Sequence, residues 1–156
     1  MKLLIINIGG FFILMSCNKE KSTFYQAYAK NSSSHQIKIV PYFSGVAYNN
    51  RIVILAPGDS TLFGNGVYYG KVGNVGFDSK YISGSDSIVV TFDNTFSISH
   101  YFITPASFSP KYYLYSSLRN LGNYLSWDYS SNDPSKYRRE AFYLYRFTEQ
   151  DYLDAK

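Results

Sequence analysis

The chain of 156 residues contains one cysteine, Cys17, and two histidines, His35 and His100. A single cysteine excludes an internal disulfide, so the hydrophobic core must hold the fold without covalent cross-links. Two histidines far apart in sequence, with no cysteine beside them, do not form a zinc-binding motif. No calcium-loop spacing occurs either. We therefore expect no metal and no cofactor.

Charge is sparse as well. Fifteen Lys and Arg against eleven Asp and Glu give a formal net charge of +4, and the one basic cluster is the KYRR stretch at 136–139. This balance lacks the clustered basicity that nucleic-acid backbones require, so we expect no nucleic-acid partner. The basic cluster could contact anionic lipid headgroups, or it could be the solvated start of a strand.

No hydrophobic run in the chain is long enough to span a membrane as a helix. The apolar stretch at 3–14 follows the positive Lys2 and, at 1.5 Å per residue, would span about 18 Å as a helix. The hydrocarbon core of a bilayer is about 30 Å thick, which argues against a membrane-spanning helix. A short apolar run behind one positive side chain is instead typical of a secretory signal peptide.

The end of this leader, LMSC at 14–17, resembles the lipobox of bacterial lipoproteins, with Leu three positions before the cysteine and a small residue just before it. The resemblance implies that residues 1–16 are a lipoprotein signal peptide that is removed, and that Cys17 becomes acylated and attaches the protein to membrane lipid. Two or more acyl chains hold a protein firmly at a membrane. The alternative is a plain signal peptide with an unrelated cysteine, but a lone thiol is unusual in an exported domain. Residues 17–22 would then be the lipidated cysteine and its polar tether.

Aromatic residues are abundant, with 17 Tyr, 12 Phe and 1 Trp making 19% of the chain. Tyr and Phe favour the half-buried surface of a pleated sheet, and residues 23–156 have the length of one domain. The sequence therefore predicts an all-β fold: a single antiparallel β-sandwich, Ig-like or related, of roughly seven to nine strands. A short C-terminal helix completes it.

Turn residues divide the chain into candidate strands. The serine-rich stretch 31–34 between two apolar runs predicts a hairpin. Pro41 cannot donate to a strand ladder, which predicts an edge or a bulge there. Residues 58–84, rich in glycine, are interpreted as long loops or irregular edge strands, and residues 130–135 as a turn.

The clearest hairpin joins the strands 87–92 and 96–103. Because a one-residue slip moves every side chain to the other face, the apolar faces match only with a three-residue loop at 93–95, which sets Phe92 opposite Phe96. Asn94 is the residue best able to take a left-handed conformation in that loop. A terminal strand is predicted at 139–147.

After the terminal strand, the residue pattern changes from that of a strand to that of a helix. Thr148, with Asp151 three residues later, forms a capping-box pattern, which predicts a helix of at most two turns at the end of the chain.

Three stretches, DSIVVTFD at 86–93, RNLGNY at 119–124 and YLYRFTEQDYLDA at 143–155, resemble a family of small Gram-negative lipoproteins. Those proteins share a lipobox, a DSVxVxFD strand, an RN-L-x-NY stretch and a terminal YxYxFTEEDYxxA. The resemblance implies a lipid anchor at the outer membrane, on its periplasmic or surface face, and a β-sandwich. It implies no activity, because none is assigned to the family.

One stretch resembles an enzyme motif. Residues 53–60 end in Gly-Asp-Ser, as does the nucleophile block of GDS-type lipases and esterases. Those enzymes also need an Asp-x-x-His and a Gly-x-Asn-Asp block, and neither occurs here. A Pro-Gly turn leaving a strand is the favoured interpretation. His100 lies on an apolar strand face, which favours a core position over a catalytic one.

Four aromatic side chains near predicted loops are candidate ligand-binding residues: Trp127, Tyr129, Tyr112 and Tyr113. Exposed rings could stack on sugars or form a protein-binding patch, or the rings could simply pack across strands. We therefore expect a non-enzymatic, membrane-anchored envelope lipoprotein that acts as a binding or structural accessory for a glycan or an envelope protein. The alternatives are a glycan-binding module and, least favoured, a small hydrolase built on Ser60 and His100.

Overall fold

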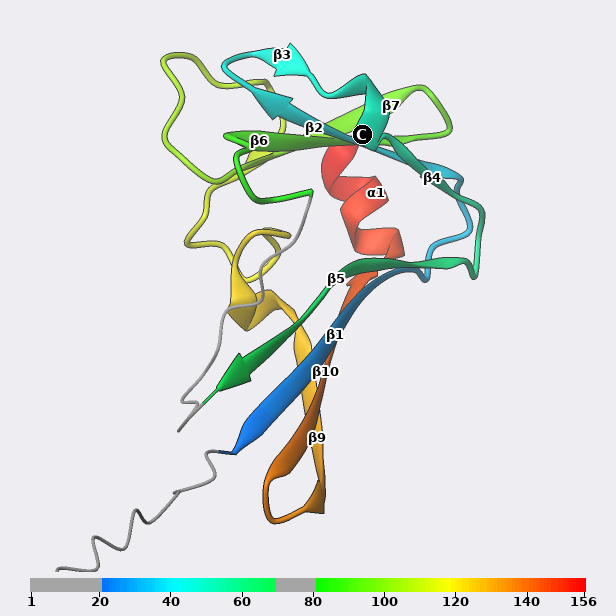
Figure 1. The fold of residues 1–156 in the computed structure, drawn as a ribbon. Coiled ribbons are helices and arrows are strands. Elements are labelled where there is room, and N and C mark those ends of the chain that lie inside the picture. The colour runs from blue at the N-terminus through cyan, green and yellow to red at the C-terminus, as the bar shows by residue number, and fades with distance from the viewer. Residues whose placement is uncertain (1–20, 70–80) are drawn as a thin grey trace, which may run out of the picture.

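The computed structural model describes residues 21–69 and 81–156. The leader at 1–16, Cys17 and most of the expected tether lie outside the described residues. Within the described part, ten strands form two sheets, with two short 3-10 helices and one α-helix (Figure 1).

The elements are β1 (Ser22–Asn31), β2 (Ile37–Phe43), β3 (Val46–Ala47), η1 (Asn49–Arg51), β4 (Val53–Leu55), β5 (Ser60–Tyr69), β6 (Ser87–Phe92), β7 (Phe96–Tyr101), β8 (Tyr112–Tyr113), η2 (Tyr124–Ser126), β9 (Asp128–Ser135), β10 (Arg138–Phe147) and α1 (Glu149–Ala155). The all-β class and the short C-terminal helix are confirmed.

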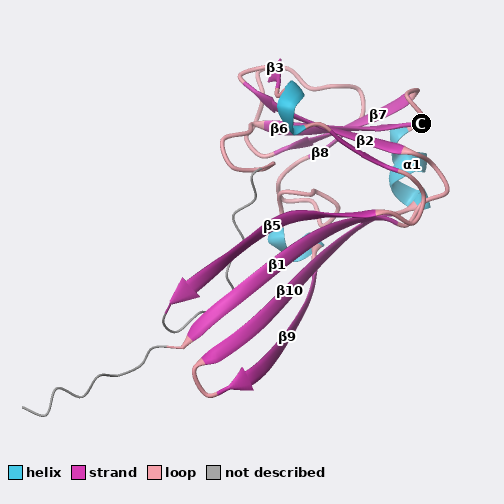
Figure 2. Ribbon diagram, turned by 45° about the vertical axis from the view of Figure 1, so that its right-hand side comes forward, coloured by secondary structure: helices cyan, strands magenta, loops and turns pink. Residues whose placement is uncertain are grey.

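The first sheet has the strand order β5-β1-β10-β9, and the second has the order β3-β2-β6-β7-β8, with β4 also pairing β2. Most neighbours are antiparallel, as expected, but each sheet contains one parallel pair. These pairs are β1 with β10 and β7 with β8, so both sheets are mixed. The sheets lie face to face at one end and splay apart toward the other, and α1 lies between them (Figures 1 and 2).

The hairpin expected around residues 31–34 is wrong. β1 and β2 belong to different sheets, and the polar segment turns the chain from one sheet to the other. The fully buried side chain of Asn31 holds this corner: its amide donates to the backbone oxygens of His35 at 2.7 Å and Leu55 at 3.1 Å. Its Oδ1 accepts from the backbone N–H of Ser33 at 3.0 Å. Polar turn residues suit a corner between sheets as well as a hairpin, so composition alone does not separate the two.

The glycine-rich region contains a ten-residue edge strand, β5, which pairs with β1 through a register shift at Ala27/Tyr28. The edge-strand interpretation therefore holds for 60–69, while residues 70–80 lie outside the described part. The turn expected at 130–135 is wrong, because β9 runs through it as the other edge of the first sheet. Every residue of β9 is exposed, so the strand lacks the apolar alternation by which strands are recognised.

Pro41 lies where the outer neighbour of β2 changes from β4 to β3. Its carbonyl accepts from the N–H of Tyr48 at 2.8 Å on that outer side, where the missing N–H of proline breaks no regular ladder. β2 has neighbours on both sides, so the predicted edge or bulge is present only as this local gap in the outer ladder.

The β6–β7 hairpin forms as predicted. Phe92 lies opposite Phe96 and Val90 opposite Ile98, and Asn94 has a φ of 57°. The capping box is also present, because the N–H of Thr148 donates to Asp151 at 2.7 Å and the side chain of Thr148 bonds the same carboxylate. Among the described residues, no helix has the length and apolar character needed to cross a bilayer.

The core lies between the two sheets and is rich in aromatic side chains. Its largest fully buried members are Phe63 from the first sheet, Phe92 from the second and Phe147 at the end of β10. Trp127, the only tryptophan of the chain, packs against Phe63 with ring centroids 5.8 Å apart. Its fluorescence therefore reports on the packing of this core.

We expect Asn31→Ala to destabilise the protein by about 3 kcal/mol, because it leaves buried carbonyl and N–H groups of the corner without partners. Urea unfolding followed by Trp127 fluorescence measures the loss. Asn132→Ala, on the exposed strand β9, is the matched control and should change the stability by less than about 0.5 kcal/mol. Equal effects of the two substitutions would show that the corner does not depend on the Asn31 side chain.

Candidate functional site

The four aromatic residues predicted to bind ligand do not form one site. Trp127 is only 5% exposed, and its Nε1 donates to the backbone oxygen of Leu121 at 2.9 Å. For Trp127 the structure has the packing alternative, because the segment that carries it packs into the core. Tyr129 is exposed on β9 and lies beside Tyr143, with ring centroids 5.2 Å apart.

Tyr112 and Tyr113 are adjacent on β8, and their side chains therefore point to opposite faces of the second sheet. The hydroxyl of Tyr113 bonds Asp154 of α1 and accepts from Nε of Arg119 at 3.1 Å. Tyr112 is 41% exposed on the outer face. Of the four candidates, Tyr112 alone borders the cleft described next.

The outer face of the second sheet carries an open cleft of about 710 Å³, beneath the loop at 103–107. Its floor follows one row across three strands, because Tyr42 on β2 pairs with Ser87 on β6, and Ser87 pairs with Tyr101 on β7. The cleft is lined by Tyr42, Ser44, Gly45, Asp86, Ser87, Val89, Ser99, Tyr101, Ile103, Thr104, Pro105, Ala106 and Ser107.

An aromatic cluster continues from the cleft. The rings of Phe108 and Tyr112 stack with centroids 4.6 Å apart, and both lie against Tyr101, at 5.6 Å and 6.0 Å. The Tyr101 hydroxyl accepts from the N–H of Ser109 at 3.0 Å, which fixes the ring. Burial raises the pKa of Tyr101, but hydrogen bonds with Ser109 and Ser99 outweigh it and hold the pKa below its usual value.

Asp86 is the one charged residue among the described residues that line this cleft. Its Oδ1 accepts from the hydroxyl of Ser87 at 3.0 Å, and its backbone oxygen accepts from the N–H of Phe102 at 2.9 Å. The site was not found from the sequence. The predicted hairpin register already set Ser87 opposite Tyr101, but the loop at 103–107 shows no pattern that assigns it to this face.

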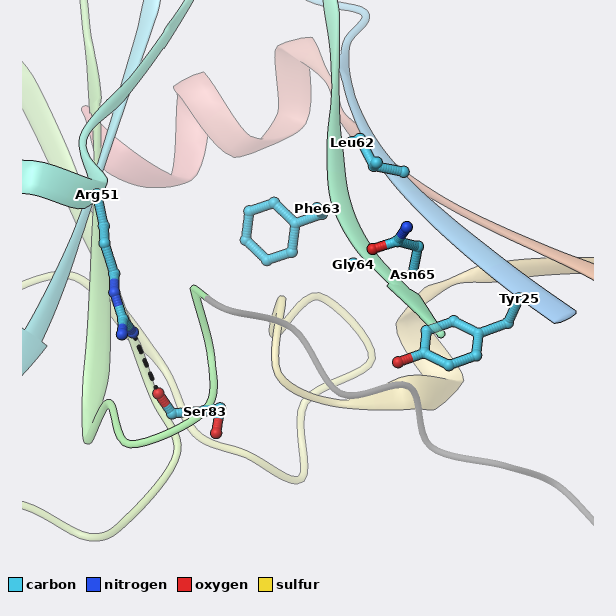
Figure 3. Close-up of a pocket in the computed structure, with 7 residues that line it drawn as sticks. All are labelled: Tyr25, Arg51, Leu62, Phe63, Gly64, Asn65 and Ser83. Carbon is cyan, nitrogen blue, oxygen red and sulfur yellow. Dashed lines mark hydrogen bonds between the residues drawn. The ribbon is translucent and has the colours of Figure 1, made fainter. Parts of the chain in front are cut away.

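A smaller pocket, of about 370 Å³, opens between the sheets (Figure 3). It is lined by Tyr25, Arg51, Leu62, Phe63, Gly64, Asn65 and Ser83. Nη1 of Arg51 donates to the backbone oxygen of Ser83 at 3.3 Å, and its guanidinium lies 4.8 Å from the ring centre of Tyr48. The guanidinium of Arg51, the cationic group of this pocket, is thus already bound by other groups of the protein.

A cluster of charged groups joins α1 to the segment between β8 and η2. Nη2 of Arg119 lies 2.7 Å from Oδ1 of Asp151, which is 2% exposed. Arg119 also approaches Asp154 at 3.4 Å and donates to the hydroxyl of Thr148 at 3.3 Å. Burial and the hydrogen bond with Asp154 raise the pKa of Tyr113, which stays a neutral donor. The contacts of these residues hold α1 against the segment that contains Arg119.

His100 is fully buried, as predicted. Its Nδ1 accepts from the N–H of Leu121 at 2.9 Å, so the proton sits on Nε2, which has no hydrogen-bond partner within the described part of the chain. The rings of Tyr113, Tyr145 and Phe147 present their edges or faces to it at centroid distances of 5.2–6.5 Å. Burial chiefly, and the charge of Arg119, lower the pKa of His100 to about 3.

Ser60, the nucleophile of the hydrolase alternative, starts the exposed edge strand β5 of the first sheet, whereas His100 is buried in the second. The residues before Ser60 form a turn, in which the N–H of Asp59 donates to the oxygen of Ala56 at 3.0 Å and Gly58 has a φ of 87°. The Pro-Gly turn interpretation is confirmed.

His35 is half-buried rather than fully solvated. Its ring stacks on Tyr152 with centroids 3.6 Å apart, and its nitrogens bond Asp93 and approach Glu149 at 3.5 Å. The hydrogen bond with His35 is the main reason why the pKa of Asp93 is lowered. In residues 21–69 and 81–156, no group of three or more His, Cys, Asp or Glu side chains is arranged to hold a metal ion.

Comparisons of the chain with protein-family models, with curated proteins and with solved structures found no match. The resemblance to small Gram-negative lipoproteins therefore stays a prediction, and function has to be argued from the residues.

We expect Arg119→Met to destabilise the protein by about 2–3 kcal/mol, because it removes the cation beside the buried carboxylate of Asp151, although that carboxylate keeps its bonds with Thr148. Arg146→Met removes an exposed pair with Asp128 and should cost less than about 1 kcal/mol. Urea unfolding of both variants tests the difference. If Arg119→Met lowers the free energy of unfolding no more than Arg146→Met does, the stabilising role of the Arg119–Asp151 cluster is contradicted.

The buried His100 should make the protein less stable in mild acid. The unfolded chain binds a proton at this residue below its ordinary pKa of about 6.5, whereas the folded protein binds it only near the lowered pKa of about 3. Stability is therefore retained above pH 6.5 and falls as the pH drops, by about 2–3 kcal/mol between pH 6.5 and 4.5.

The His100→Asn variant separates this contribution from other titrating groups. At pH 7 this variant should be less stable than the wild type. Between pH 7 and pH 4.5, however, it should lose much less stability than the wild type does, as measured by urea unfolding at each pH. His35→Asn is the matched control and should keep the steep loss. Parallel pH profiles for wild type and His100→Asn would refute the assignment.

Proposed function

We propose that this protein is a non-enzymatic lipoprotein of the bacterial cell envelope, anchored to the outer membrane through acylated Cys17, and that its domain binds or supports another envelope component. The observation that carries the proposal is the position of the first described residues. The N–H of Ser22 donates to the oxygen of Tyr137 at 2.9 Å, and Nζ of Lys21 lies 2.8 Å from Asp133. The chain thus enters the domain at the turn of the β9–β10 hairpin.

This entry point lies far from the cleft. β1 has ten residues and spans roughly 33 Å, and the second sheet lies at the opposite end of the first sheet from Ser22 (Figures 1 and 2). Cys17 precedes Lys21 by four residues, whose greatest reach is roughly 15 Å. An anchor there would hold the hairpin turn near the lipid and leave the outer face of the second sheet directed away from it.

The hairpin turn has a composition that suits a lipid surface. Lys136 and Arg138 are exposed beside Tyr137, whose side chain is 45% exposed. Lys21 and Arg139 share the carboxylate of Asp133, and Arg138 pairs with Glu140 at 2.9 Å. Four cations therefore face two carboxylates, and this excess of positive charge beside an aromatic ring favours anionic headgroups.

The absence of an enzyme activity is supported by the positions of the candidate catalytic residues. The neutral, buried His100 offers no accessible base, and Ser60 lies in the other sheet. No observation favours the hydrolase alternative.

The test is the mass of the protein purified from membranes of a Gram-negative host that expresses the full chain. We expect a mature chain that begins at Cys17 and carries acyl chains, and we expect Cys17→Ser to abolish acylation and to release the protein from the membrane fraction. Ser130→Ala, an exposed change in the domain, is the matched control and should stay acylated and membrane-bound. An unmodified thiol, or an intact leader on membrane-derived protein, would overturn the proposal.

A further inference from the structure

We infer that the cleft on the outer face of the second sheet is a binding site for a neutral saccharide chain. This inference rests on the proposed function, in that it names the class of envelope component that the domain binds. Of the four candidate ligand-binding residues named from the sequence, it keeps only Tyr112.

Two tyrosines, Tyr42 and Tyr101, line the cleft, and further aromatic rings pack against Tyr101 at its side. The cross-strand row places Tyr42 and Tyr101 on either side of Ser87, which is buried between them. Beyond Tyr101, the stacked rings of Phe108 and Tyr112 remain 45% and 41% exposed. The C–H groups on one face of a pyranose ring are attracted to the electron-rich face of an aromatic ring, so a row of rings supports successive sugar units.

Polar groups line the remainder of the cleft. Ser44 lies beside the left-handed turn at Gly45, and Thr104 and Ser107 lie on the loop above, all three exposed. The carboxylate of Asp86 has roughly four acceptor positions, of which the bond from Ser87 occupies one. A carboxylate and several hydroxyls arranged around aromatic rings match the paired hydroxyl groups of a sugar, which both donate and accept.

The charge of the cleft selects among ligands. Among the described residues, 21–69 and 81–156, no Lys or Arg lines it, and Asp86 supplies the one charge of that lining. An anionic ligand, such as a phosphate-bearing or sulfated polymer, would meet a carboxylate with no cation to balance it. The cleft therefore favours an uncharged saccharide over an acidic one.

The position of the cleft argues against an extended peptide as its ligand. Peptides that extend a sheet pair with an edge strand, whereas this cleft lies across the face of β2, β6 and β7. The volume of about 710 Å³ lies within the range of roughly 300–1,000 Å³ that is typical of small-ligand sites. An open cleft of this size accommodates the middle of a chain as well as its end.

The experiment uses the mature protein purified from membranes in detergent micelles, applied to an array of neutral oligosaccharides of glucose, mannose, galactose and N-acetylglucosamine, with sulfated and phosphorylated glycans alongside. We expect binding to at least one neutral series and none to the acidic series. Tyr112→Ala and Asp86→Asn should each weaken that binding at least tenfold in titration calorimetry with the bound oligosaccharide. Tyr129→Ala removes an equally exposed ring from the first sheet and should leave the affinity unchanged.

Three outcomes would overturn the inference: no neutral glycan binds, acidic glycans bind better, or Tyr129→Ala weakens binding as much as Tyr112→Ala. Unfolding monitored by Trp127 fluorescence confirms that each variant is folded, and Tyr112→Phe, which keeps the ring, should restore most of the affinity. The mass of the same samples reports acylation of Cys17 separately. An acylated protein without glycan binding would thus refute the saccharide site alone, and a glycan-binding protein without acyl chains would refute the anchor alone.

Discussion

The fold depends on the parallel pairing of β1 with β10, which joins the start of the described chain to its end. The ten residues of β1 pair in unbroken register with β10, from Ser22 opposite Arg138 to Asn31 opposite Phe147. Parallel neighbours need a crossover connection, and here the second sheet is formed within that connection before the chain returns. The outer cleft, the corner at Asn31 and the position of α1 all follow from this one long-range pairing.

Where the two sheets come together, polar groups join α1 to the segment between β8 and η2. Arg119 holds Asp151 and Thr148 at the start of α1, and the hydroxyl of Tyr145 donates to the backbone oxygen of Arg119 at 2.7 Å. The stretches 119–124 and 143–155 meet at this place. Several of their side chains form buried ion pairs and hydrogen bonds that hold α1 against the rest of the fold.

The features that could be predicted from the sequence are local ones. The β6–β7 register, the capping box at Thr148 and the gap in the outer ladder at Pro41 each depend on residues within a few positions of one another. The corner at Asn31 could not be predicted because it depends on Leu55, far away in the chain. The edge strand β9 was missed because all its residues are exposed, so it lacks the apolar alternation of a strand. The same holds for the candidate binding residues. Tyr112 is exposed, as a ligand-binding ring must be, whereas Trp127 is buried by its packing against Phe63 and Tyr145, which are distant in sequence.

The central place of β1 has a mechanical consequence. A tether pulling on Ser22 while a bound partner holds the far sheet would load β1 along its own axis. Its hydrogen bonds to β5 and β10 run across that axis, so both ladders would be sheared together instead of unzipping one bond at a time. Under the proposed anchor, the two ladders that flank β1 would therefore share such a load along the full length of the strand.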